Sequence, residues 1–455
     1  MSTRTQALEF DLVVIGGGSG GLAAAFRASE HGARVAMLEP GELGGTCVNV
    51  GCVPKKAMWL AAQLSEHIAL AREVGFEVAR PKLDWCEFIA DRQRYIANIH
   101  ASYRRRLDAG GIVLVPARGR LLDARTVVTD DGARLVAPHI LIATGARPQR
   151  PSIPGTELGQ VSDDFFRWVE APAHVAVVGG GYIGVELAGV LQSLGSCVEL
   201  FVRGDRVLGH FEAELALHLE ENYRQAGIAL HHGFDPAALE RGGDGRLRIL
   251  ARDDRSATEF DAVLFATGRV PNTGDLGLEA AGVALGERGH VCVDDRQNTN
   301  VPGLYAVGDV TDRIALTPVA IAAARRLMDR VFGGKAEARL DYGNVPTVVF
   351  SHPPLASVGL SEAQARERFG EDVHVYRAEF RAMLHALAES PQRSLFKLVC
   401  VGEERRVLGI HLLGDGADEI LQGFAVALKR GIVLDDLRDT VAIHPTSAEE
   451  VVLMK

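Results

Sequence analysis

Two copies of one strand–glycine loop–helix unit limit the folds open to this chain more than any other feature. In each copy, an apolar run of strand length precedes a glycine-rich turn, a helix-length stretch and a second apolar run. This order predicts the βαβ pattern of a parallel sheet, and two copies about 160 residues apart predict two nucleotide-binding domains. The segments are 11–16, 22–30 and 34–38 in the first copy, and 174–179, 185–194 and 198–202 in the second.

Both glycine-rich turns match the dinucleotide fingerprint G-x-G-x-x-G. Glycine permits a tight turn and a close approach of the backbone to a pyrophosphate, whose charge the following helix N-terminus stabilises. The alternative, two turns without a ligand, does not account for the βαβ frame around each copy. The positions are Gly16, Gly18 and Gly21 in the first copy and Gly179, Gly181 and Gly184 in the second.

The residue at the end of the second strand distinguishes the two predicted ligands. Glu39 in the first copy can accept hydrogen bonds from an unphosphorylated ribose, as in FAD, whereas Val202 occupies the equivalent position in the second. Arg203 and Arg206 follow Val202, and cationic groups there favour the 2′-phosphate of NADPH. The alternative is that these arginines are only a solvated loop pair.

Further along, two near-identical strand-and-turn segments predict the exits of the two nucleotide domains, and a third predicts a return to the first domain. After Tyr342 the pattern changes to antiparallel strands with polar turns, followed by helices. The strand-and-turn segments are 139–145, 262–268 and 303–309; the later strands are 347–350, 395–400 and 407–413, and the helices 417–429 and 448–454.

Composition narrows the functional classes. The chain has 455 residues, 47% hydrophobic and 24% charged, as in globular proteins of several domains. Its net charge of −10 argues against nucleic-acid or anionic-membrane partners. The first apolar run is interrupted by glycines, so we expect no signal peptide, no membrane helix and a cytoplasmic location. Six cysteines do not suit a disulfide scaffold, and no metal site is expected.

Cys47 and Cys52 lie in the most informative stretch, Gly-Gly-Thr-Cys-Val-Asn-Val-Gly-Cys-Val-Pro-Lys-Lys over positions 44–56. A helix-like run over 55–64 starts just after Cys52, and a helix N-terminus near lysines favours a thiolate. Four intervening residues permit a local, easily reduced disulfide. We interpret the other four cysteines, Cys86, Cys197, Cys292 and Cys400, as small buried hydrophobic residues.

This stretch resembles the active site of the pyridine nucleotide–disulfide oxidoreductases, the glutathione reductases in particular. The resemblance runs from about Phe10 to Lys455, and further motifs agree in order at 143–145, 179–186, 268–272, 307–309, 316–320 and 444–450. It implies two Rossmann-like domains and a C-terminal α+β dimerisation domain. The implied ranges are 1–146 and 272–341 for FAD binding, 147–271 for NADPH binding and 342–455 for dimerisation.

The resemblance also implies catalytic roles. Cys52 lies against the flavin and Cys47 attacks the substrate disulfide. His444, oriented by Glu449 and supplied by the other subunit of a homodimer, protonates the leaving thiolate, a task that suits imidazole. Lys55 pairs with Glu186 near the flavin, and Tyr182 covers the nicotinamide site.

Cofactor contacts are implied over a wider set. For FAD they are Gly16, Gly18, Ser19, Gly20, Gly21, Glu39, Gly45, Thr46, Lys55, Thr144, Gly145, Arg269, Gly308, Asp309 and Thr317. For NADPH they are Gly179, Gly181, Tyr182, Ile183, Glu186, Arg203, Arg206 and Gly268.

The implied substrate is glutathione disulfide, whose carboxylates Arg325 can pair with, beside Ser19, Tyr95 and Tyr103. Phe26 and Gly209 depart from the pattern, because each stands where glutathione reductases often carry an arginine. Two alternatives therefore stay open: a reductase of another small disulfide, such as a trypanothione-like one or lipoamide, and a non-catalytic redox-sensing flavoprotein.

Overall fold

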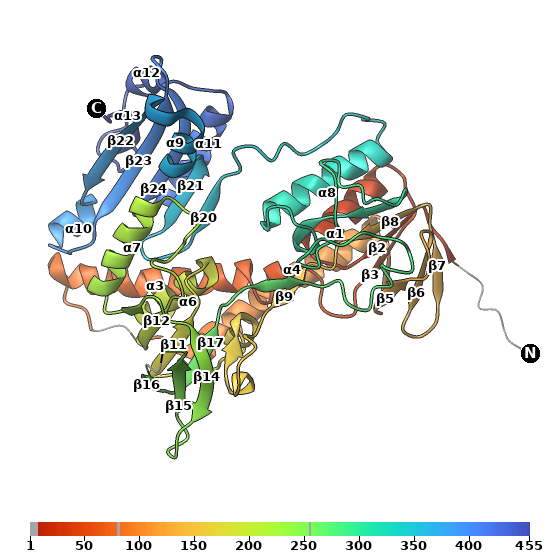
Figure 1. The fold of residues 1–455 in the computed structure, drawn as a ribbon, viewed down its shortest axis with the longest axis horizontal. Helices are drawn as coiled ribbons and strands as arrows, with labels where there is room; N and C mark the ends of the chain where they lie inside the picture. Colours follow the sequence, from red (N-terminus) through yellow and green to blue (C-terminus); the bar gives the residue numbers. More distant parts are fainter. Residues whose placement is uncertain (1–7, 80–81, 254–255) are drawn as a thin grey trace, which may run out of the picture. The chain divides into compact units, whose positions relative to one another are not determined.

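The computed structural model describes residues 8–79, 82–253 and 256–455, and the chain separates into two compact units (Figure 1). Unit 1 comprises Met1–Lys55, Ile89–Pro148 and Arg269–Tyr342; unit 2 comprises Lys56–Phe88, Gln149–Gly268 and Gly343–Lys455. Each unit therefore combines segments that are distant in sequence. The four domain ranges inferred from the sequence stay a prediction.

Unit 1 is built on a five-stranded parallel sheet. Its strand order is β19-β8-β2-β3-β4, with β2 at Leu12–Ile15, β3 at Val35–Leu38, β4 at Val113–Val115, β8 at His139–Ile142 and β19 at Leu304–Ala306. Helices α1 (Ser19–Glu30) and α8 (Thr317–Val331) pack side by side (Figure 1). Because the strands are apolar at nearly every position, both faces of the sheet can be buried, as parallel sheets require.

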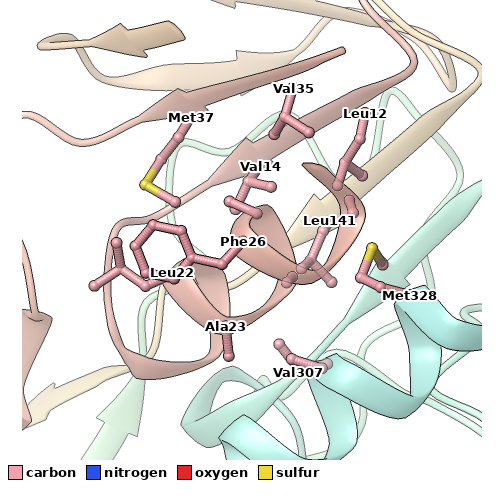
Figure 2. Close-up of a cluster of buried hydrophobic side chains, with 14 of the residues drawn as sticks. Leu12, Val14, Leu22, Ala23, Phe26, Val35, Met37, Leu141, Val307 and Met328 are labelled. Atoms are coloured by element: carbon pink, nitrogen blue, oxygen red, sulfur yellow. The ribbon is translucent and has the colours of Figure 1, made fainter. Parts of the chain in front are cut away.

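One of the two core clusters of unit 1 lies between this sheet and the two helices. Figure 2 shows Val14 and Met37 of the sheet beside Leu22 and Phe26 of α1, with Met328 of α8 in the same cluster. Nearly all of these side chains are buried, and the burial of each large one stabilises the fold by roughly 1.5–3 kcal/mol.

Smaller elements complete unit 1. They are the sheet β1-β7-β6-β5 (Leu8–Glu9, Arg134–Val136, Thr126–Thr129, Gly119–Leu121), the pair β9 (Ala146–Pro148) and β18 (Arg269–Pro271), and η2 (Gly308–Val310). Helix α2 (Gly45–Asn49) leads into α3 (Cys52–Glu73), and α4 spans Trp85–Ala109. The sequence did not predict these two long helices at their full length.

Unit 2 contains the second parallel sheet. Its order is β10-β17-β11-β12-β13, at Gln160–Val161, Ala262–Phe265, His174–Val178, Cys197–Phe201 and Ala229–His231. The accompanying helices are α5 (Ser162–Phe165), α6 (Tyr182–Ser193) and α7 (Ala213–Gln225), and η1 covers Thr156–Leu158. An antiparallel sheet, β14 (Pro236–Arg241), β15 (Leu247–Ala251) and β16 (Ser256–Phe260), is inserted before β17.

The C-terminal part of unit 2 is an antiparallel sheet packed against α11 (Figure 1). Its order is β20-β21-β24-β23-β22, at Thr347–Val349, Leu355–Gly359, Arg406–Leu413, Ser394–Val401 and Val373–Phe380. The helices are α9 (Glu362–Phe369), η3 (Gly370–Asp372), α10 (Met383–Leu387), α11 (Ala417–Lys429), α12 (Leu434–Arg438) and α13 (Glu449–Val452).

These elements confirm the predicted fold class of parallel α/β sheets with a C-terminal α+β part. The last helix is shorter than the predicted 448–454. None of the described helices is both long and apolar enough to cross a membrane.

The expectation of four buried cysteines was wrong for three of them. Only Cys400 is buried, on the core face of β23, whereas Cys86, Cys197 and Cys292 are exposed. Cys86 lies in the first turn of α4 and Cys197 opens β12, and neither belongs to a hydrophobic core cluster of the described residues.

Candidate active site

The first glycine loop is held tightly against its sheet. Gly16 has a φ of +110°, which favours glycine, and a Cβ there would collide with the backbone of Ala143. A Cβ on Gly21 would collide with the carbonyl oxygen of Gly16, so the helix approaches the strand as closely as the fingerprint requires. The Gly17 amide donates a hydrogen bond to Glu39 at 2.8 Å, which fixes the carboxylate at the end of β3.

Neighbouring segments close around this loop. Gly18 forms a bridge with Gly44, and a Cβ on Gly45 would approach the Gly18 Cα to 2.8 Å. The Gly20 position is equally close-packed, because a Cβ there would lie 2.9 Å from Val307. This leaves a cradle lined by backbone, which is the environment that a pyrophosphate needs.

Arg269 connects the redox loop with Asp309. Its guanidinium donates to the Thr46 hydroxyl at 3.4 Å and lies 4.0 Å from the Asp309 carboxylate. Burial raises the pKa of Asp309, and Arg269 offsets only part of that effect. A half-buried carboxylate of this kind suits a ligand hydroxyl that donates to it.

Four further predicted FAD contacts lie at the ends of helices or strands of unit 1: Thr144, Gly145, Gly308 and Thr317. Thr144 and Asn272 exchange hydrogen bonds of 2.8 and 2.9 Å, Gly145 and Gly308 have positive φ, and Thr317 opens α8. The backbone cradle, the fixed Glu39 and the half-buried Asp309 together fit FAD, whose individual contacts remain predictions.

The second glycine loop repeats the geometry of the first. Gly179 has a φ of +129° beside the Ala266 backbone, and a Cβ on Gly184 would collide with the carbonyl oxygen of Gly179. Val202 packs where Glu39 stands in the first loop, because a Cβ on Gly180 would meet its side chain at 2.6 Å. Gly181 precedes α6 and has open space around it, and Gly268 has a φ of +128° after β17.

The arginine loop after β12 folds back toward this site. The Leu208 amide donates to the Gly180 carbonyl at 2.7 Å, which returns the segment to the glycine loop. Arg203 is exposed, and Arg206 donates to the Gly209 carbonyl at 2.9 Å. The Arg206 Nε is buried without a hydrogen-bond partner among the residues that the structure describes. Two cationic groups beside the second loop fit a 2′-phosphate.

Tyr182, Ile183 and Glu186 occupy the first turns of α6. Tyr182 is 46% exposed at the helix N-terminus, and Ile183 is half-buried. Glu186 is buried and accepts a hydrogen bond of 2.8 Å from the Phe350 amide. Its predicted pairing with Lys55 stays a prediction, since the two residues belong to different units.

The two redox cysteines are neighbours in space. Cys52 is the first residue of the 22-residue helix α3, whose N-terminal amides stabilise a thiolate. Its sulfur lies 3.5 Å from the Thr317 hydroxyl. A hydrogen bond with Cys52 and then burial raise the pKa of Cys47, and the hydroxyls of Thr317 and Ser19 partly offset this. The hydrogen bond between the two thiols places their sulfurs side by side, as disulfide exchange within the pair requires.

The two lysines after Cys52 differ in their surroundings. Lys56 lies 3.0 Å from Asp418 and 3.8 and 4.1 Å from the ring centroids of Trp59 and Phe350. It is thus held within unit 2 by an ion pair and by cation–π contacts. Lys55 is half-buried at the end of unit 1, and its amide donates to the Gly51 carbonyl.

His444 and Glu449 form the predicted pair. The His444 Nδ1 lies 2.9 Å from the nearer Glu449 oxygen, and the hydrogen bond with His444 lowers the pKa of Glu449. The imidazole is 79% exposed, and its contact with Glu449 uses Nδ1, which leaves Nε2 for another group. The His444–Pro445 peptide is cis.

The predicted substrate residues come from three helices of unit 1. Ser19 opens α1 and reaches Cys47, Tyr103 and Tyr95 belong to α4, and Arg325 is exposed on α8. Tyr95 is 60% exposed, whereas Tyr103 packs against Phe26 with 6.5 Å between ring centroids. The structure thus brings Ser19 and Tyr103 together with Cys47, and Tyr95 lies further along α4.

One contact of this site was missed from the sequence. The His100 Nε2 and the Asn49 Oδ1 lie 2.8 Å apart, so α4 is attached to the segment between the two cysteines. Asn49 also donates to the carbonyls of Leu43 and Gly45, which fixes that segment. Asn49 is part of the quoted motif, but nothing in the sequence relates it to His100, about 50 residues later.

Comparisons with known proteins agree with this geometry. The chain matches the family model described as pyridine nucleotide-disulphide oxidoreductase over residues 10–324, and that family's dimerisation domain over residues 345–455. It is 41% identical to a protein of Yarrowia lipolytica named glutathione reductase, over 98% of this chain and 99% of the relative. It is 42% identical to a Schizosaccharomyces pombe protein of the same name, over 98% of each.

Proposed function

The chain belongs to the pyridine nucleotide–disulphide oxidoreductases, and we propose that within this family it uses NADPH to reduce glutathione disulfide. The observation that carries the proposal is the Cys47–Cys52 pair at the start of α3, bordered by the Ser19 and Thr317 hydroxyls. Near-complete coverage of two relatives named glutathione reductase supports the choice of substrate.

When bound, FAD supplies the two-electron chemistry that connects a nicotinamide with the cysteine pair. The backbone cradle at Gly16–Gly21 holds its pyrophosphate, Glu39 accepts from its ribose, and Asp309 accepts from its hydroxyl chain. Arg203 and Arg206 bind the 2′-phosphate that distinguishes NADPH from NADH, while Tyr182 covers the nicotinamide pocket.

The disulfide exchange uses the cysteines in sequence. The Cys47 thiolate attacks one sulfur of the substrate, the S–S bond breaks, and the departing thiolate takes a proton from His444. The Cys52 thiolate then attacks the Cys47 sulfur of the mixed disulfide, which releases the second product as a thiolate that takes a proton from solvent and leaves a Cys47–Cys52 disulfide. Glu449 orients the imidazole, and we propose that its exposed Nε2 face serves the site of the partner subunit in a homodimer.

Steady-state turnover of the FAD-loaded enzyme tests this proposal. NADPH should be preferred to NADH, and glutathione disulfide should be turned over better than lipoamide or a trypanothione-like disulfide. Negligible turnover of glutathione disulfide would remove the proposed substrate.

A Cys47→Ser variant separates the half-reactions. It should still accept electrons from NADPH, seen as flavin bleaching under anaerobic conditions, and should lose at least about 10³-fold in disulfide turnover. Surviving turnover would contradict the role of Cys47. Absence of a long-wavelength thiolate–flavin band on NADPH titration of the unmodified enzyme would favour a non-catalytic sensor.

A further inference from the structure

Phe26 is a core residue and does not offer an open apolar wall. Its side chain is 9% exposed and lies among Val14, Leu22 and Met37 on the inner side of α1 (Figure 2). The aromatic ring at this position therefore gives little surface for an apolar part of a substrate. A substrate would therefore contact the group that covers the ring and not the ring itself.

The guanidinium of Arg106 covers Phe26. Its central carbon lies 4.0 Å from the ring centroid, within the range of a cation–π contact. Arg106 follows Tyr103 by three residues on α4, so both side chains project from one face of the helix, and Tyr103 also packs on Phe26. A positive charge thus lies over the position where glutathione reductases often carry an arginine.

Arg106 belongs to the surroundings of the redox pair. Helix α4 is attached to the redox loop through His100 and Asn49, one turn before Tyr103. Burial raises the pKa of Tyr103, the charge of Cys47 raises it further, and the charge of Arg106 lowers it, so Tyr103 lies within electrostatic range of both.

The charges around this face are unevenly paired. Arg27 has Asp329 and Glu30 as partners, and Arg104 has Glu42. Within the described residues, neither Arg106 nor Arg325 has a carboxylate within 4.0 Å, and both are exposed. Two exposed cations of unit 1, one on α4 and one on α8, are therefore available to an anionic ligand.

The spacing suits a short peptide. Phe26 follows Ser19 by seven residues of α1, or roughly 10 Å, and Arg325 follows Thr317 by eight residues of α8, or roughly 12 Å. Ser19 and Thr317 both contact the cysteine pair. A disulfide of tripeptides reaches about this far from its sulfur atoms to its ends.

We propose that Arg106, stacked on Phe26, is a specificity determinant that binds a carboxylate of the substrate disulfide. This inference rests on the proposed function and deepens it: the site selects disulfides with free carboxylates over those whose carboxylates are amides of cationic amines. Phe26 holds the guanidinium in place and shields one of its faces from water, which strengthens a charge-assisted hydrogen bond from its edge.

The test compares Arg106→Gln with Arg105→Gln in the FAD-loaded enzyme. Arg105 is the exposed neighbour on α4, so the control makes the same change of charge on the same helix. We expect Arg106→Gln to raise the KM for glutathione disulfide about tenfold, equivalent to ~1.4 kcal/mol, with kcat within about twofold of the control. Equal KM values for the two variants would overturn the proposal.

A charge reversal adds a second measurement. Arg106→Glu should weaken turnover of glutathione disulfide further and improve, relative to Arg105→Glu, that of its bis-amide with a cationic amine. No change in this preference would also overturn the proposal. If the Arg105 control and the unmodified enzyme fail to turn over glutathione disulfide, the proposed function itself is wrong, which distinguishes the two failures.

Discussion

Lys397 on β23 should be among the most sensitive single positions of unit 2. Its side chain is 1% exposed, and its Nζ lies 2.7 Å from Glu212, 2.7 Å from Glu214 and 2.8 Å from Glu362. Replacing it with methionine keeps the volume but leaves three carboxylates without their central cation. Removing one partner of a buried ion pair costs about 3–5 kcal/mol, and we expect ~3 kcal/mol, because Glu214 and Glu362 retain some hydration.

The stability lost by Lys397→Met should depend on pH in a defined direction. Burial alone would raise the pKa of each glutamate, but the hydrogen bonds and charge of Lys397 lower all three below the ordinary value of 4.5. A lowered folded-state pKa contributes stability above about pH 4.5 that is lost as the pH falls. The pKa of Lys397 is raised above 10.5, because its three carboxylates outweigh burial, so its contribution persists to that pH. The deficit of Lys397→Met should thus be full near pH 7 and shrink below about pH 4.5.

Amide hydrogen exchange along Ser394–Val401 is the assay, since unfolding of a multidomain flavoprotein need not be two-state. A loss of ~3 kcal/mol predicts exchange about a hundredfold faster near pH 7. Arg377→Met is the control: Arg377 contacts Glu214 and Glu362, but it is 43% exposed and should cost less than about 1 kcal/mol. If β23 of Lys397→Met exchanges no faster than that of Arg377→Met, the reasoning is refuted.

Two further predictions concern the cofactor and the acid–base pair. Arg206→Ala should raise the KM for NADPH by about tenfold and leave that for NADH within about twofold, and equal effects on both would argue against a phosphate contact. Glu449→Gln should lower kcat for the disulfide about tenfold while NADPH-driven flavin reduction keeps its rate, because the substitution weakens the contact that orients His444; a slower flavin reduction would contradict this assignment.

The sequence predicted the elements whose signals are local. The strands beside both glycine loops were located within one residue, and the helix Ala417–Lys429 has its predicted bounds, since an apolar run bounded by glycine determines its own limits. The proximity of Cys47 to Cys52 followed from their spacing, and that of His444 to Glu449 from the resemblance.

Contacts between distant segments could not be predicted in this way. The stacking of Arg106 on Phe26 joins helices about 80 residues apart in sequence. Phe26 alone suggested that this position has no positive charge, whereas the structure shows that Arg106 supplies one from another helix. The ion cluster around Lys397 contains residues from α7, α9, β23 and the residue before α7. In the sequence, each of them resembles an ordinary surface charge, and only the fold shows that they are in contact.

A ligand is attracted only by those positive charges that no neighbouring carboxylate neutralises. For this reason, basic residues with similar neighbours in the sequence can have different functions. Lys56 follows Lys55 directly, yet Lys56 is held by Asp418 and two aromatic rings within unit 2. Arg104 is paired with Glu42, whereas Arg106 rests on a ring that contributes no negative charge. A cation on an aromatic platform is both oriented and unneutralised. This combination of fixed orientation and free charge is why Arg106, unlike an ordinary surface arginine, can select a carboxylate.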